Sequence, residues 1–308
     1  MSIRIGMGLG LGEPPSPEAY WRWVARCEAL GVDSLWHSDQ LLRPSLEPLV
    51  MMAALAAATK TLRFGMNAMV ISHRDPLVAA KQCATIDYLA PGRLLPVFGV
   101  GDAADRAWAA TGRSPGGRGG RANEALEIFR RLLTEDSVTF EGEHFQYRDA
   151  RVSPRPERPL PIWIGGDSEA AIRRTAALGD GWLGGLTTPE AAGAVVARIK
   201  AALQETGRRI DEDHYGVVVP FRIGAPDDPQ AERFRRALLE RRAERKDAAA
   251  RPVSPAIGTA ATVAEMFRRY VDVGVAKFVA VPLAGGADDL IAQTERLSQE
   301  VRPAVEDR

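Results

Sequence analysis

Short apolar runs alternate with helix-like segments along this 308-residue chain. Eight runs have the length of a strand, and a segment with helical periodicity follows each of them. The expected strands cover residues 3–9, 34–38, 62–71, 94–100, 161–166, 181–185, 215–223 and 277–282. Continuous apolar runs suit a parallel sheet covered by helices. The count predicts an α/β fold, a (β/α)₈ TIM barrel, as a single domain over residues 1–308.

A doubly wound open sheet is the alternative fold. It would normally carry a Gly-x-Gly-x-x-Gly turn after the first strand, opening a helix. Here Gly6, Gly8 and Gly10 have a different spacing, and Pro14-Pro15 follows them. The barrel is therefore the better prediction.

Two segments interrupt the strand–helix rhythm. Residues 102–158 form an insertion between strands four and five, with a helix expected near 123–133 and a hairpin at 138–147. Residues 225–257 follow strand seven and are dense in charge. This second segment is either a solvated helix or mobile loop, or a lid over the mouth of the barrel.

Composition excludes several classes of protein. Forty basic and forty acidic residues leave no net charge to attract nucleic acid or a membrane surface. No apolar run is long enough to span a bilayer, and no secretory signal opens the chain, so we expect a cytoplasmic protein. Cys27 and Cys83 are expected to be buried free thiols. The histidines lack paired metal-ligand spacing, so no metal site is predicted; they are His37, His73, His144 and His214.

The fifth expected strand ends in a Gly-Gly turn. Gly165-Gly166-Asp167-Ser168 leads directly into a helix. Glycines let the backbone approach a ligand closely, and the N–H groups at a helix start favour phosphate. These four residues are therefore predicted to form an anion cradle.

Other candidate residues lie where strands two to four end, the edge at which barrel active sites gather. They are His37, Asp39, Asn67, Gly99 and Gly101. Side chains alternate along a strand, so His37 and Asp39 face the same side. A floor of glycines suits a flat, phosphate-bearing cofactor better than a metal. A flavin-free barrel enzyme such as an aldolase would need a lysine at this edge. Lys277 lies at the opposite end, where strand eight begins, which counts against an aldolase.

An ordered set of segments resembles the bacterial-luciferase-like oxidoreductases, particularly an actinobacterial branch similar to deazaflavin-dependent enzymes. The segments include residues 31–36 with Asp39, Arg74-Asp75-Pro76, 80–89, 99–101 and 161–166. Each is moderately specific, whereas their order along nearly the whole chain is highly specific.

The resemblance implies a cofactor in the barrel mouth, either coenzyme F420 or FMN. Asp39 would touch its ring, and Asn67-Ala68 would lie beneath the ring, where relatives often have a non-proline cis peptide. Gly99 and Gly101 would line the cofactor site, and Gly165, Gly166, Asp167 and Ser168 would hold the phosphate. A homodimer through the helices after strands two and three is also implied. The apolar stretch 51–58 would form that surface or pack within the barrel.

One position departs from the pattern of the family. Deazaflavin-dependent dehydrogenases have a basic histidine directly after the aspartate, where this chain has Gln40. A glutamine amide cannot take up a proton at neutral pH. His37, His73 and Asp102 are the other candidates for moving a proton.

The predicted catalytic residues are His37, Asp39 and Gln40. The predicted function is coenzyme F420-dependent hydride transfer to or from a small organic substrate, and Gln40 favours a reductase. An FMN-dependent monooxygenase and a non-catalytic cofactor-binding relative are the alternatives.

Overall fold

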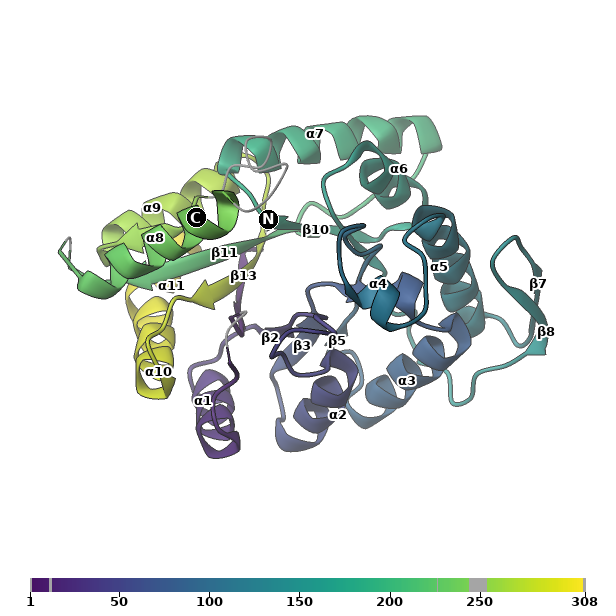
Figure 1. Cartoon of the computed structure of the whole chain (residues 1–308), viewed down its shortest axis with the longest axis horizontal. Coiled ribbons are helices and arrows are strands. Elements are labelled where there is room, and N and C mark those ends of the chain that lie inside the picture. The colour runs from purple at the N-terminus through teal and green to yellow at the C-terminus, as the bar shows by residue number, and fades with distance from the viewer. Residues whose placement is uncertain (1, 11–12, 226, 244–253, 307–308) are drawn as a thin grey trace. The chain divides into compact units, whose positions relative to one another are not determined.

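The computed structural model describes residues 2–10, 13–225, 227–243 and 254–306, and the chain is traced in Figure 1. The chain divides into two compact units. The first comprises Met1–Trp36, Gly184–Ala201 and Asp211–Arg308, and the second comprises His37–Leu183 and Ala202–Ile210.

The first unit contains a parallel sheet in which β11, β13, β1 and β2 are successive neighbours and β12 pairs with β11. Its strands are β1 (Arg4–Gly8), β2 (Ser34–His37), β11 (Tyr215–Ile223), β12 (Ala256–Gly258) and β13 (Lys277–Pro282). Its helices are α1 (Pro17–Ala29), most of α7 (Pro189–Thr206), α8 (Pro229–Ala243), α9 (Ala260–Asp272), α10 (Ala287–Arg296) and α11 (Arg302–Glu306), and the π-helical turn Leu297–Val301 joins the last two.

Local chemistry fixes the helices of this unit. Ser16 caps α1 by accepting a hydrogen bond from the amide of Ala19 at 3.3 Å, and Pro17 occupies the first turn, where its missing N–H costs nothing. At the start of β13, buried Lys277 forms an ion pair with Asp33. This lysine therefore serves the packing of the sheet.

The second unit holds the parallel strands β4, β6 and β9 with the first part of β10, and the parallel pair β3-β5. These strands are β3 (Arg63–Met66), β4 (Met69–Val70), β5 (Leu94–Leu95), β6 (Val97–Gly99), β9 (Trp163–Gly165) and β10 (Gly181–Leu186). The helices are α2 (Pro48–Ala58), the 3₁₀ turn Ile71–His73, α3 (Pro76–Leu89), α4 (Ala107–Ala110), α5 (Arg118–Thr134) and α6 (Glu169–Leu178).

Two expected strands are interrupted. The strand expected at 62–71 breaks at Asn67-Ala68 and ends in a 3₁₀ turn, so only β3 and β4 remain of it. The strand expected at 94–100 is split at Pro96, which has no N–H to donate to a ladder. The prediction of a continuous strand was therefore wrong at both places, because the periodicity of apolar residues does not reveal a local break in a strand.

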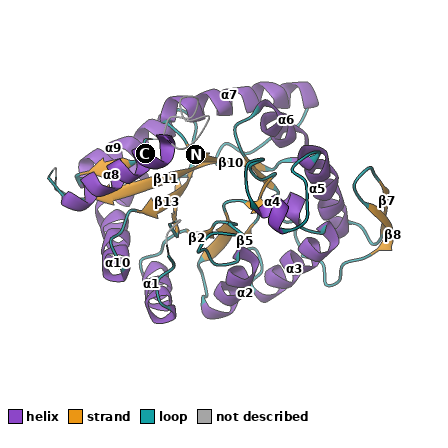
Figure 2. Ribbon diagram, in the orientation of Figure 1, coloured by secondary structure: helices purple, strands orange, loops and turns teal. Residues whose placement is uncertain are grey.

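The insertion forms the predicted hairpin from β7 (Val138–Glu141) and β8 (Gln146–Ala150), visible at the edge of Figure 2. The carboxylate of Glu124 on α5 accepts hydrogen bonds from three amides of the hairpin turn, those of Glu143, His144 and Phe145, at 2.9–3.1 Å. Gly142 passes so close that a Cβ there would lie 2.4 Å from Glu124 Oε2. The helix predicted at 123–133 begins earlier, at Arg118 within the glycine run.

Much of the charged segment lies within the described residues. Its first part contains α8, in which Ala231 is buried. Its last residues include β12, which pairs with β11 and so belongs to the sheet. The sequence analysis did not predict this strand. Residue 226 and residues 244–253 of the expected lid lie outside the described residues. Across the part of the chain that is described, no helix is long and apolar enough to cross a membrane.

Candidate functional site

Three strand ends of the second unit meet in a floor of small residues. Strands β4, β6 and β9 are neighbours. Gly99 and Gly165 are the last residues of β6 and β9, and Ala68 directly precedes β4. A Cβ on Gly99 would lie 3.6 Å from the Cβ of Ala68, and one on Gly165 would lie 3.3 Å from it. The structure therefore brings these three predicted residues together. The peptide bond between Asn67 and Ala68 is cis, as the resemblance implies.

Asn67 is tied to the end of β2 by two hydrogen bonds. Its amide donates to the carbonyl of His37 at 3.0 Å, and its Oδ1 accepts from Ser38 Oγ at 3.1 Å. The floor is thus fixed to the segment that carries Asp39.

Asp39 is clamped by Arg74. The guanidinium spans both carboxylate oxygens, with Nη1 on Oδ2 and Nη2 3.2 Å from Oδ1, and the amide of Val70 donates to Oδ2 at 2.8 Å. Arg74 also binds Glu47 at 2.8 Å. Only 7% of the Asp39 side chain is exposed. The carboxylate is therefore held in one orientation at the end of β2.

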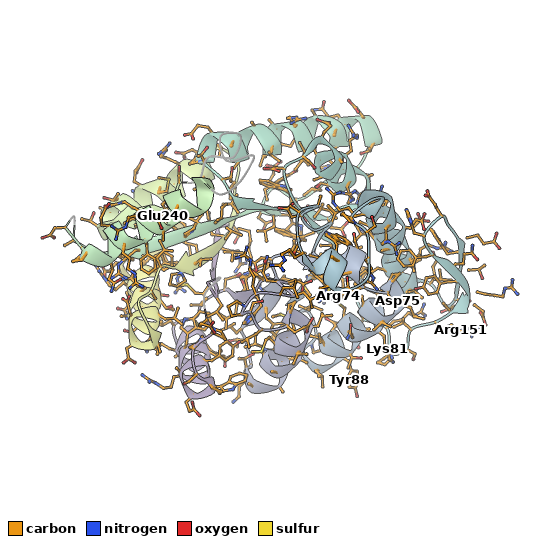
Figure 3. The ribbon with its side chains drawn as sticks, viewed as in Figure 1. Arg74, Asp75, Lys81, Tyr88, Arg151 and Glu240 are labelled. Atoms are coloured by element: carbon orange, nitrogen blue, oxygen red, sulfur yellow. The ribbon has the colours of Figure 1, made fainter. Side chains whose placement is uncertain are left out.

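Arg74, labelled in Figure 3, is a site residue that the sequence reasoning missed. It lies in the Arg74-Asp75-Pro76 run that supports the family resemblance, but no role was given to it. Only the fold reveals that it pairs with a residue 35 positions away.

His37 and Gln40 flank this clamp along the chain. His37 is 2% exposed, and burial lowers the pKa of its imidazole to about 4. It is therefore neutral at neutral pH. The carbonyl of Gln40 accepts from the Arg43 amide and from Ser45 Oγ, which fixes the turn after Asp39. Catalytic roles for His37 and Gln40 stay predictions.

His73 lies against Trp108, with ring centroids 3.9 Å apart. Burial is the main cause that lowers the pKa of His73, and within the described chain its buried Nδ1 has no hydrogen-bond partner. Trp108 also faces Gly101, where a Cβ would lie 3.1 Å from the indole and 2.9 Å from Val70. Gly101, at φ +76°, is required here by close packing.

The Gly-Gly turn after β9 has the form expected of an anion cradle. Gly166 has φ +111°, and its carbonyl accepts from Trp182 Nε1 at 2.7 Å. Because a peptide C=O and N–H point in opposite directions, the Asp167 amide is directed away from Trp182. Ser168 caps α6 by accepting from the Ala171 amide at 3.2 Å. Gly166, Asp167 and Ser168 are exposed to solvent, so the cradle is open.

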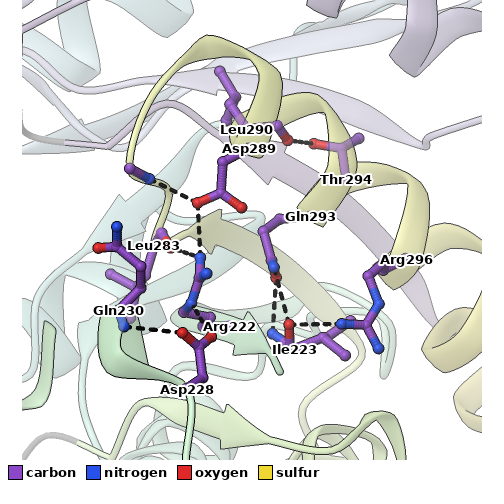
Figure 4. A network of polar contacts seen from close by, with 11 residues as sticks. Arg222, Ile223, Asp228, Gln230, Leu283, Asp289, Leu290, Gln293, Thr294 and Arg296 are labelled. Carbon is purple, nitrogen blue, oxygen red and sulfur yellow. Dashed lines mark hydrogen bonds and ion pairs between the residues drawn. The ribbon is translucent and has the colours of Figure 1, made fainter. Parts of the chain in front are cut away.

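A separate polar network lies in the first unit at the ends of β11 and β13. Figure 4 shows Arg222 between Asp228 and Asp289, at 2.6 and 2.8 Å, with a third bond to the carbonyl of Leu283. Asp228 also accepts from the amide of Gln230 at 2.9 Å. The network anchors the start of α8, so the base of the predicted lid is fixed to the sheet.

The residues at the strand ends fit a flat ligand that carries a phosphate. A Cβ at Gly165 would crowd Ala68, whereas one at Gly99 would only touch it. The two glycines leave a smooth backbone surface, and the turn to α6 offers helix N–H groups to an anion. Among the residues that the structure describes, no group of three or more His, Cys, Asp or Glu side chains is placed to hold a metal. Cys27 and Cys83 are free and buried, as predicted.

Comparison with known proteins gives the family and the fold. The family model for the luciferase-like monooxygenases matches residues 1–300. An F420-dependent secondary alcohol dehydrogenase superimposes with a TM-score of 0.84, at 20% identity, over 99% of both chains. The chain therefore has the predicted fold, a (β/α)₈ TIM barrel of the luciferase-like type.

Two curated relatives have different activities. An F420-dependent glucose-6-phosphate dehydrogenase of Amycolatopsis mediterranei is 30% identical over 177 residues, 54% of this chain and 53% of the relative. The pyrimidine monooxygenase RutA of Allorhizobium ampelinum is 32% identical over 183 residues, 53% of this chain and 47% of the relative. The chain spans about half the length of these curated relatives.

Proposed function

Since the chain belongs to the luciferase-like monooxygenase family, we propose that it is an oxidoreductase that uses coenzyme F420 to transfer hydride to or from a small organic substrate. The observation that supports this most is the small-residue floor of Ala68, Gly99 and Gly165 beside the open Gly-Gly turn. The similarity to F420-dependent dehydrogenases favours the deazaflavin over FMN.

Each part of the site has a proposed role. The floor would hold the flat ring, Asp39 would contact the ring, and residues 165–168 would bind the phosphate through backbone N–H groups. When bound, the deazaflavin supplies or accepts a hydride. Arg74 acts through Asp39, because its two contacts keep the carboxylate in a single orientation.

Gln40 sets the direction of the proposed reaction. Oxidation of an alcohol requires a base for the hydroxyl proton, and the Gln40 amide cannot serve as one. Buried His37, with a pKa of about 4, is a weak base and is not open to solvent. We therefore propose a reductase, in which hydride passes to an electron-poor double bond and water supplies the proton.

A monooxygenase with FMN is the second candidate, favoured by the similarity to a pyrimidine monooxygenase. A titration separates the candidates. Purified protein is mixed with F420, reduced F420, FMN or reduced FMN, and binding is followed by absorbance and fluorescence. F420 binding with no FMN binding in the same concentration range supports the proposal. Tight binding of FMN alone would replace it with the monooxygenase, and binding of neither cofactor would reject both.

A homodimer through α2 and α3 is also proposed. These neighbouring helices carry four exposed large apolar side chains, namely Val50, Val78, Tyr88 and Leu89. Tyr88, labelled in Figure 3, is 70% exposed. Burial of this surface against a second copy would remove it from water.

A further inference from the structure

The side-chain amide of Asn67 has one end bonded and the other end open. Its Oδ1 accepts from Ser38 Oγ at 3.1 Å, whereas its Nδ2 has no hydrogen-bond partner among the described residues. The Nδ2 is not one of the buried side-chain atoms that lack a partner, so water reaches it. An amide nitrogen carries two N–H donors, and here both are available to a ligand.

This open donor lies directly beside the floor of the site. The residue after Asn67 is Ala68, whose Cβ faces the last residues of β6 and β9, Gly99 and Gly165. These three floor residues have no polar side-chain atom. The Asn67 amide is therefore a polar group at the edge of an apolar surface, an arrangement by which small-molecule sites fix the orientation of a ligand.

Ser38 determines which end of the amide is open. An amide is planar, so a bond that holds Oδ1 in place also fixes the direction of Nδ2. The backbone is held as well, because the amide of Asn67 donates to the carbonyl of His37 at 3.0 Å. A third bond joins the same two segments, from the Val70 amide to Asp39 Oδ2 at 2.8 Å. The donor is therefore held in position before a ligand binds.

The charged cluster at the end of β2 offers no spare positive charge. Arg74 is shared between two carboxylates, those of Asp39 and Glu47, so the cluster as a whole is negative. His37 is buried and has a pKa of about 4, so it is neutral at neutral pH. A ligand atom that gains negative charge near this cluster would be stabilised by a neutral donor such as the Asn67 amide.

We infer that Asn67, oriented by Ser38, donates a hydrogen bond to the ring of the bound cofactor and so makes the site bind the reduced cofactor more tightly than the oxidised one. This inference rests on the proposed function. Reduction adds electron density to a flavin or deazaflavin ring, and hydrogen bonds to its ring atoms respond to that change. A hydrogen bond to a more negative acceptor is stronger, so the donor stabilises the reduced form more than the oxidised form. Ser38 is a positioning residue, because it acts through Asn67.

The test compares Asn67→Asp with Gln82→Glu. Both changes exchange an amide for a carboxylate, but Gln82 is exposed on α3. Dissociation constants are measured without oxygen for F420 and reduced F420, and for FMN and reduced FMN, by cofactor or tryptophan fluorescence. The preference is the dissociation constant of the oxidised form divided by that of the reduced form.

Two further measurements accompany this comparison. Ser38→Ala removes the bond that orients the amide and leaves Asn67 in place. The reduction potential of the bound cofactor is an independent readout, because it shifts with the ratio of the two dissociation constants. Circular dichroism verifies that each variant is folded.

We expect the wild-type ratio to favour the reduced form and Asn67→Asp to lower that ratio by roughly 10- to 100-fold. Ser38→Ala should lower it by about 3- to 10-fold, because the freed amide can turn and present Oδ1 in place of Nδ2. Gln82→Glu should leave the ratio within about twofold of wild type, since solvent and salt screen an exposed charge. Asn67→Asp and Gln82→Glu add the same charge, so a difference between them reports the contact at the floor.

An unchanged ratio in Asn67→Asp would overturn the inference, even if both affinities fall, because the amide would then only shape the site. A wild-type protein that prefers the oxidised form would overturn it as well. An equal change in Gln82→Glu would do the same, because general charge would then explain the preference. If Asn67→Asp does not fold, a wild-type ratio in Ser38→Ala decides against the inference. Wild-type protein that binds neither cofactor in either oxidation state would instead reject the proposed function.

Discussion

Replacement of Asp39 by asparagine tests the clamp at the end of β2. The change keeps the shape of the side chain and removes its charge. Three hydrogen bonds to the carboxylate are weakened, two from Arg74 and one from the Val70 amide. Only 7% of the Asp39 side chain is exposed, so water replaces these contacts poorly. Arg74 retains Glu47 at 2.8 Å, which limits the loss. We expect the free energy of unfolding to fall by about 3 kcal/mol.

The assay is urea unfolding followed by tryptophan fluorescence and by circular dichroism, analysed where both transitions coincide. Glu47→Gln is the matched control. It removes a carboxylate from the same arginine, but 42% of the Glu47 side chain is exposed, so the expected loss is below about 1 kcal/mol. The double variant Asp39→Asn with Arg74→Gln should cost about 2 kcal/mol less than the sum of the single changes.

An Asp39→Asn protein within about 0.5 kcal/mol of wild type would refute the reasoning, because a buried clamp cannot be lost at so small a cost. Additive single changes would also refute it, since they would show that Asp39 and Arg74 do not act as a pair. Cofactor affinity measured on the same variants separates the two roles of Asp39. Arg74→Lys keeps the charge but loses the two-point contact, and should lower affinity only through the orientation of Asp39.

His37→Gln should reduce the loss of stability on acidification. In wild type the folded imidazole has a pKa of about 4, whereas the unfolded one titrates near 6.5, so the unfolded state binds a proton first as the pH falls. Between about pH 7 and about pH 5, wild type should therefore lose about 2 kcal/mol more free energy of unfolding than the variant, as measured by urea unfolding at both pH values. A variant with the wild-type pH dependence would contradict this. Gly142→Ala should lower the free energy of unfolding by about 2 kcal/mol, because the new methyl group would lie 2.4 Å from Glu124 Oε2. Thermal unfolding measures this loss, and an unfolding temperature equal to that of wild type would show that the hairpin turn adjusts freely. Tyr88→Glu should give monomers in light scattering if the apolar face of α2 and α3 is the dimer surface, whereas an unchanged dimer would place that surface elsewhere.

Local sequence patterns predicted much of the fold. Strands β11 and β13 occur at the residues expected from their apolar runs, and α6 lies between the Gly-Gly turn and Gly179 as expected. Such elements depend on periodicity, capping and turn residues, all of which are read within a few positions of the chain. The same local reasoning could not register the break at Asn67-Ala68 or the strand β12, whose three residues are stabilised by pairing with β11.

The sequence by itself determined the fold class, the Gly-Gly turn before α6 and the absence of a basic side chain at Gln40, because residue identity and short spacing settle these features. Only the tertiary structure decided that Arg74 clamps Asp39, and that Ser38 binds Oδ1 of Asn67 and leaves its Nδ2 open to solvent. The physical reason is that a polar group gains or lacks a partner through contacts between residues far apart in the chain. Asp39 and Arg74 are 35 positions apart, and Ser38 and Asn67 are 29 apart. The packing of helices and strand ends brings them together, and no local pattern encodes that packing.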